Sequence, residues 1–67
     1  MELSARNQLT GTVKHTRLGT IMAEVLVDIG GQEVVATITR ASVERLDLQP
    51  GDAVTVVIKS TEVLIGK

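Results

Sequence analysis

The sequence has no cysteine, no Phe, Tyr or Trp, and only one histidine and one proline. The missing cysteines exclude disulfides and thiolate metal sites, and a single imidazole cannot form a histidine-rich site. Proteins that bind single-stranded nucleic acid stack bases on aromatic rings and carry excess positive charge, whereas this chain has a net charge of −1. We therefore expect no bound metal cation and no nucleic-acid partner.

The chain also lacks a long hydrophobic run. No apolar stretch approaches the ~20 residues of a membrane span, and the N-terminal stretch MELSARNQ lacks the basic and apolar regions of a signal peptide. We expect a cytoplasmic protein without a membrane partner.

A core built from so short a chain is small. Ordering 67 residues costs on the order of 100 kcal/mol, and domains of this size usually gain stability from disulfides, metals or partner subunits. Because the sequence offers neither disulfides nor a metal site, we expect a single domain over residues 1–67 that forms a homo-oligomer.

What is present is a series of short apolar segments separated by turns. Alternating residues predict strands at residues 7–16, 20–29 and 32–39, with a hairpin turn at Gly30 and Gly31. In the second of these strands, Ile21, Ala23, Val25, Val27 and Ile29 share one face. Met22, Glu24, Leu26 and Asp28 share the other.

The second half of the chain completes the predicted fold. Residues 40–48 fit a helix of about two turns with Ser42 as its N-cap, and QPGD at residues 49–52 is typical of a β-turn. Residues 53–66 predict two more strands, broken near residues 59–62. This order favours an all-β protein: a five-stranded OB-like Greek-key barrel with one short helix between strands 3 and 4.

Three clusters of hydrogen-bond donors interrupt the apolar pattern. They lie before the first strand (Ser4, Arg6 and Asn7), at the helix entrance (Thr37, Thr39, Arg40 and Ser42) and at the break in the last segment (Lys59, Ser60 and Thr61). Each cluster has an ordinary explanation: a solvated terminus, helix capping, or an edge-strand lysine followed by hydroxyls that satisfy the local backbone. Alternatively, cations, hydroxyls and free backbone N–H groups together suit the binding of an oxyanion.

No group of residues suggests catalysis. The sequence shows no Ser/His/Asp arrangement, no pair of carboxylates and no Cys/His ligand set. The single His15 lies between Lys14 and Thr16 at the end of a predicted strand, where we expect it to be exposed. The sequence therefore predicts a binding protein and not an enzyme.

A family resemblance covers nearly the whole chain. It is carried by SARNQLTGTV at the N-terminus, MAEVLVDIGG and VVATITRASVERLDLQPGD in the middle, and VVIKSTEV near the C-terminus. These stretches resemble the molbindins, also called Mop or molybdenum–pterin-binding proteins. The same unit recurs as the molybdate-binding domain of molybdate-responsive regulators and of some molybdate transporter ATPases.

The resemblance implies a fold, an assembly and a ligand. It implies an OB-like barrel that assembles as a hexamer, a trimer of dimers, and binds molybdate or tungstate at subunit interfaces as an intracellular molybdenum store or buffer. It implies no cofactor beyond this oxyanion. The ligand-binding residues that it implies belong to the three donor clusters: Ser4, Arg6, Thr39, Ser42, Lys59 and Ser60.

Two alternatives stay open. The stretch ITRASVERLDLQPGDAVTVVI also resembles AbrB-type swapped-hairpin transcription factors, which bind DNA as dimers, although the SARN and IKSTEV ends do not fit that family. The chain would then bind DNA with a steep dependence on salt. The third reading is a purely structural oligomerisation module, whose stability no small ligand would change.

Overall fold

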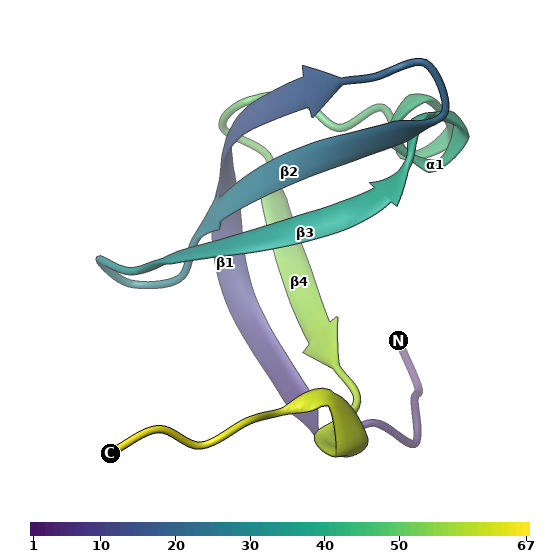
Figure 1. Ribbon diagram of the computed structural model, residues 1–67. Coiled ribbons are helices and arrows are strands. Elements are labelled where there is room, and N and C mark those ends of the chain that lie inside the picture. Colours follow the sequence, from purple (N-terminus) through teal and green to yellow (C-terminus); the bar gives the residue numbers. More distant parts are fainter.

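The computed structural model describes all 67 residues, and its fold is one curled antiparallel sheet (Figure 1). The elements in chain order are β1 (Asn7–Leu18), β2 (Met22–Asp28), β3 (Glu33–Thr39), the helix α1 (Arg40–Leu46), β4 (Ala53–Ile58) and the short 3-10 helix η1 (Ser60–Glu62). The strand order β3-β2-β1-β4 is that of a Greek key, in which the fourth strand returns to lie beside the first. The predicted all-β class, with one short helix after the third strand, is confirmed.

The strand β1 is the longest and joins the two halves of the sheet. Its first half pairs with β4 and its second half pairs with β2. Where the partner changes, Gly11 lies so close to β2 that a Cβ there would be 2.8 Å from the carbonyl oxygen of Asp28. A bulge between Val13 and His15 follows, and bulges increase the local bend and twist of a strand. Together these features curl the sheet toward a barrel.

The core fills the concave side of the curled sheet and consists of small side chains. The buried residues are Val13, Ala23, Val25, Val27 and Val43. Three of them, Ala23, Val25 and Val27, share one face of β2, as the period-two pattern predicted. Ile21 was placed on the same face of a strand over residues 20–29, but it precedes β2 in the turn from β1 and is 73% exposed.

The helix α1 closes one end of the concave side by burying Val43. Its N-cap is Thr39, whose Oγ1 accepts a hydrogen bond from the backbone N–H of Ser42 at 3.1 Å, so the prediction of Ser42 as the cap was wrong. The helix ends at Leu46 and not at residue 48, because Asp47 adopts a left-handed conformation with φ 49°. With seven residues α1 cannot cross a membrane, and the structure has no other helix long and apolar enough to do so.

The predicted fifth strand is not present. After β4 the chain turns through η1, and the last residues extend away from the sheet with Leu64 92% and Ile65 90% exposed. A strand needs a neighbour that accepts and donates its backbone hydrogen bonds, and residues 63–67 have none within the chain. The single chain is therefore a four-stranded curled sheet and not a closed five-stranded barrel.

Candidate functional site

Two of the three donor clusters meet at one end of the sheet. The first strand and the fourth are antiparallel and in register with Asn7 opposite Ile58, so the residues just before β1 lie beside those just after β4. The resulting shallow hollow is lined by Ser4, Ala5, Lys59, Ser60 and Thr61. The structure thus brings together residues that are far apart in the sequence.

The side-chain donors of this hollow make no hydrogen bond to the rest of the chain. None of the side-chain hydrogen bonds involves Ser4, Lys59 or Ser60, and the two ion pairs of the chain, Lys14–Glu33 and Arg40–Glu44, lie elsewhere. No carboxylate lines the hollow. Its ammonium and hydroxyl groups therefore remain free to donate hydrogen bonds to an anion.

The turn η1 fixes the backbone around these donors. It is closed by a 2.9 Å hydrogen bond from the N–H of Glu62 to the carbonyl oxygen of Lys59. The hydroxyls of Ser60 and Thr61 make no hydrogen bond to the backbone in this turn, so local backbone capping does not explain their presence.

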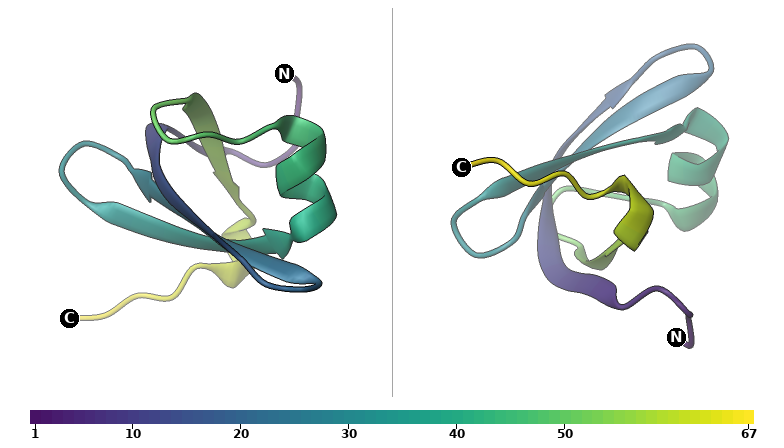
Figure 2. Two further views of the ribbon diagram at one scale, coloured as in Figure 1. Left: turned by 90° about the horizontal axis from the view of Figure 1, so that it is seen from above. Right: turned by 60° about the horizontal axis from the view of Figure 1, so that its bottom comes forward.

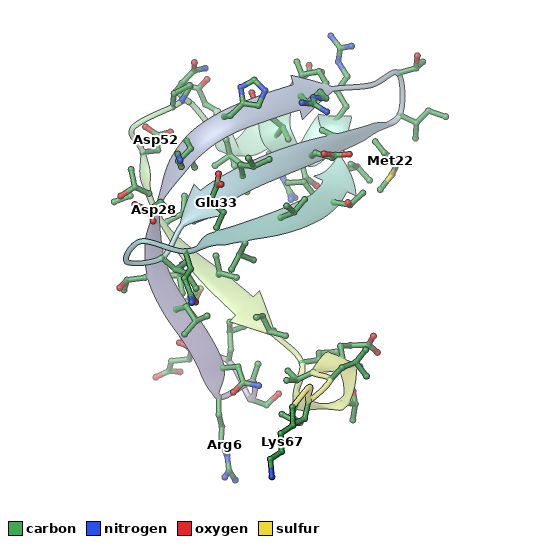
Figure 3. The ribbon with its side chains drawn as sticks, turned by 60° about the vertical axis from the view of Figure 1, so that its left-hand side comes forward. Arg6, Met22, Asp28, Glu33, Asp52 and Lys67 are labelled. Carbon is green, nitrogen blue, oxygen red and sulfur yellow. The ribbon has the colours of Figure 1, made fainter.

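Arg6 lies near the hollow but does not line it. Figure 3 shows its side chain at the start of β1, projecting away from the sheet. It is exposed and has no carboxylate partner in the chain. The guanidinium can therefore contact a ligand or a second chain that lies against this end of the molecule.

The third cluster lies at the other end of the molecule, at the start of α1 (Figure 1). Here Thr39 Oγ1 donates to Ser42 Oγ at 2.8 Å and also accepts from the backbone N–H of Ser42. Within one chain Thr39 caps the helix, and the hydroxyl of Ser42 accepts a hydrogen bond from the hydroxyl of Thr39. The structure therefore unites Ser4, Lys59 and Ser60 and leaves Thr39 and Ser42 apart from them.

Two residues of the hollow were not among the six expected site residues. Thr61 had been named in the donor cluster with Lys59 and Ser60, but the family resemblance did not add it to the six ligand-binding residues. Ala5 has no polar side chain, so only its backbone can contribute and no sequence pattern reveals it.

Comparison with known proteins places the chain in a family. A family model described as the TOBE domain matches residues 3–65, so the chain belongs to the TOBE domain family. Within it, the chain is 47% identical over 66 residues to molybdenum-pterin-binding protein 1 of Clostridium pasteurianum, and the match covers 97% of each chain. The predicted resemblance is thereby confirmed, and the family is one of binding proteins and not of enzymes.

Solved structures share the fold. A molybdate-binding protein from Sporomusa ovata superposes with a TM-score of 0.95 at 49% identity, with all of both chains covered. The cytoplasmic molybdate-binding protein ModG, solved with molybdate bound, superposes with a TM-score of 0.85 at 44% identity, over 90% of this chain and 43% of the ModG chain.

Proposed function

We propose that this protein binds molybdate or tungstate at sites between subunits and serves to store and buffer molybdenum in the cytoplasm. The observation that carries the proposal is the hollow beside β1 and β4, in which Ser4, Lys59 and Ser60 present donors with no carboxylate among them. Relatives and solved structures named for molybdenum or molybdate support the identity of the anion.

The chemistry of the ligand matches such a hollow. Molybdate is a tetrahedral dianion with four acceptor oxygens and no donor at neutral pH, so its site needs hydroxyls, N–H groups and cations. Phosphate carries a proton near neutrality and needs an acceptor as well, which a donor-only site does not offer. Sulfate matches molybdate in charge and can be rejected only by size, which requires rigid walls around the anion.

A second copy of the chain completes the site in this proposal. The hollow of one chain is open, and Thr39 and Ser42 lie too far along the molecule to join it, so we assign these two hydroxyls to the neighbouring subunit. Arg6, which projects from the same end as the hollow, supplies a second cation. The whole chain then acts as one domain in a homo-oligomer, a hexamer built as a trimer of dimers, without any cofactor beyond the oxyanion.

A thermal-shift comparison with matched anions tests the proposal. A ligand that binds only the folded assembly raises the unfolding midpoint, and the rise grows with the logarithm of the ligand concentration divided by Kd. We expect molybdate to raise the midpoint and an equal concentration of sulfate to raise it much less. Equal shifts with both salts would contradict selective binding, and no shift with either would contradict the site itself.

A further inference from the structure

Several backbone carbonyl oxygens around the donor hollow are already hydrogen-bonded within the chain. Those of Lys59 and Ser60 accept the backbone hydrogen bonds that close the turn η1. The carbonyl oxygen of Ala5 accepts a hydrogen bond from the side-chain amide of Gln8. Three of the five residues that line the hollow therefore have their backbone acceptor engaged, whereas the side-chain donors of the hollow stay free.

The bond from Gln8 is the one of these three that depends on a side chain. Its Nε2 lies 2.7 Å from the carbonyl oxygen of Ala5, which is short for an N–H···O hydrogen bond. Outside the helices and strands, it is the only hydrogen bond that involves residues 1–6. Gln8 thus holds the segment that carries Ser4 beside η1, at the end of the molecule that Figure 1 and the right view of Figure 2 show.

The same bond fixes the orientation of the peptide between Ala5 and Arg6. This peptide is planar and trans, so its carbonyl oxygen and its N–H point in opposite directions. With the oxygen held by Gln8, the N–H of Arg6 points away from Gln8 and makes no hydrogen bond within the chain. Without Gln8 this peptide could rotate and present an acceptor next to Ser4.

We propose that Gln8 is a positioning residue of the anion site, which engages the carbonyl of Ala5 and so lets the site reject hydrogen phosphate. Molybdate and sulfate have only acceptor oxygens, so a free carbonyl oxygen in the site repels both. Hydrogen phosphate has one O–H, which such an oxygen would accept. Gln8 does not line the hollow and acts through Ala5. This inference rests on the proposed function and adds a residue that sets the specificity of the same site.

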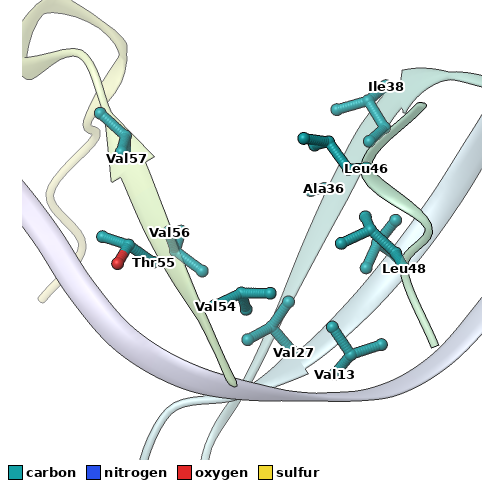
Figure 4. A pocket seen from close by; sticks show the side chains of 11 residues that line it. Val13, Val27, Ala36, Ile38, Leu46, Leu48, Val54, Thr55, Val56 and Val57 are labelled. Carbon is teal, nitrogen blue, oxygen red and sulfur yellow. The ribbon is translucent and has the colours of Figure 1, made fainter. Parts of the chain in front are cut away.

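Gln8 can be replaced without disturbing the core. It lies opposite Val57 of β4, and directly opposite residues point to the same face of a sheet. Figure 4 shows Val54 and Val56 extending from β4 toward β3 across an apolar cavity. Because successive residues of a strand alternate between faces, Val57 and Gln8 belong to the other face, where Gln8 is exposed.

The first test compares the affinities of three anions in two variants of Gln8. Gln8→Met removes the amide and keeps the length of the side chain. Gln8→Glu keeps the shape but cannot donate when ionised, and it serves if the methionine variant fails to fold. Calorimetry gives the Kd of molybdate, and competition with molybdate gives those of sulfate and phosphate, at mildly alkaline pH where phosphate is the hydrogen phosphate dianion.

We expect molybdate to bind about threefold or more weakly to both variants, and the ratio of the sulfate Kd to the phosphate Kd to rise about threefold or more, as for one neutral hydrogen bond. The new charge of Gln8→Glu weakens both dianions alike and leaves this ratio as a measure of the free carbonyl. A hollow that is merely looser would lose its size selection against sulfate and phosphate equally. An unchanged ratio in a folded variant would therefore overturn the proposal.

The matched control is Gln49→Met. Gln49 also donates a side-chain hydrogen bond, to Asp47 Oδ1 at 3.0 Å, but it precedes the opposite end of β4 and does not line the hollow. Its replacement should leave all three affinities within twofold of those of the unchanged protein. A rise of the sulfate-to-phosphate ratio equal to that of the Gln8 variants would contradict a specific role of Gln8.

A second test examines the hydrogen bond without any anion. Nuclear magnetic resonance measures hydrogen exchange of the side-chain amides, and that of Gln8 should be slower than that of Gln32, which makes no side-chain hydrogen bond. Equal rates would show that Gln8 does not hold Ala5.

The outcomes separate this inference from the proposed function. If the unchanged protein binds molybdate and the Gln8 variants keep the same affinities for all three anions, Gln8 has no positioning role and the anion function stands. If the unchanged protein binds no molybdate, both proposals are wrong.

Discussion

Replacement of Lys59 by alanine is the most direct test of the proposed site. Lys59 lines the donor hollow and makes no ion pair within the chain, so its removal leaves no carboxylate unpaired. Stability without ligand should therefore change by no more than about 0.5 kcal/mol, as for other surface substitutions. A hydrogen bond to a charged group contributes about 1.5–3 kcal/mol. Because Lys59 is exposed in the single chain and is screened by salt, we take the lower end of this range.

A loss of about 1.5 kcal/mol weakens binding by about tenfold. Isothermal titration calorimetry with molybdate measures this change directly, and the difference from the unchanged protein should shrink as the salt concentration rises. Lys14→Ala is the matched control, because Lys14 is a lysine of the same sheet that pairs with Glu33 at 3.4 Å and does not line the hollow. An affinity of Lys59→Ala within twofold of the unchanged protein, or an equal loss in Lys14→Ala, would refute the role of Lys59.

Two further predictions concern the scaffold. Gly11→Ala should destabilise the protein by about 1–3 kcal/mol through overpacking, because the new Cβ would meet Val27 Cγ1 at 2.5 Å. Gly66→Ala is the control in a thermal melt, because a Cβ at this position would meet no atom within 4 Å beyond the adjoining residues. Equal midpoints of the two variants would show that β1 can shift to make room. Thr39→Ala should cost about 1 kcal/mol by removing the helix cap, which lowers the midpoint by roughly 4–8 °C at fixed protein concentration, whereas Thr39→Ser keeps the capping oxygen and should retain most of the stability. Equal melts of the alanine and serine variants would contradict the capping role.

Strand positions were predictable because an alternating pattern reports directly which face of a strand is buried. Ala23, Val25 and Val27 share one face as their spacing indicated, and this face is buried. Ile21 fits the same pattern but lies in the turn before β2, and the pattern itself does not show where a strand begins. The N-cap was also missed, because Thr39 and Ser42 are both good capping residues and only the backbone angles decide between them.

The site was predictable in its chemistry more than in its geometry. The donors Ser4, Lys59 and Ser60 could be selected because hydroxyls and cations without carboxylates suit an oxyanion. Their proximity follows from the register of β1 against β4, which no local pattern contains. The sequence alone could not show that Thr39 and Ser42 lie at the other end of the chain.

For the C-terminal residues 63–67 the sequence predicted a strand, and the structure of the single chain contains none there. The residues around Leu64 have the composition of a strand, and composition is a local property that the sequence carries by itself. A strand exists only when another strand satisfies its backbone groups, and residues 63–67 belong to no strand of the four-stranded sheet. The sequence thus determined the family, the strand-forming segments and the donor chemistry, because these depend on residue types and their spacing. Only the tertiary structure decided which donors meet and that the barrel of a single chain stays open, because both depend on contacts between distant parts of the chain.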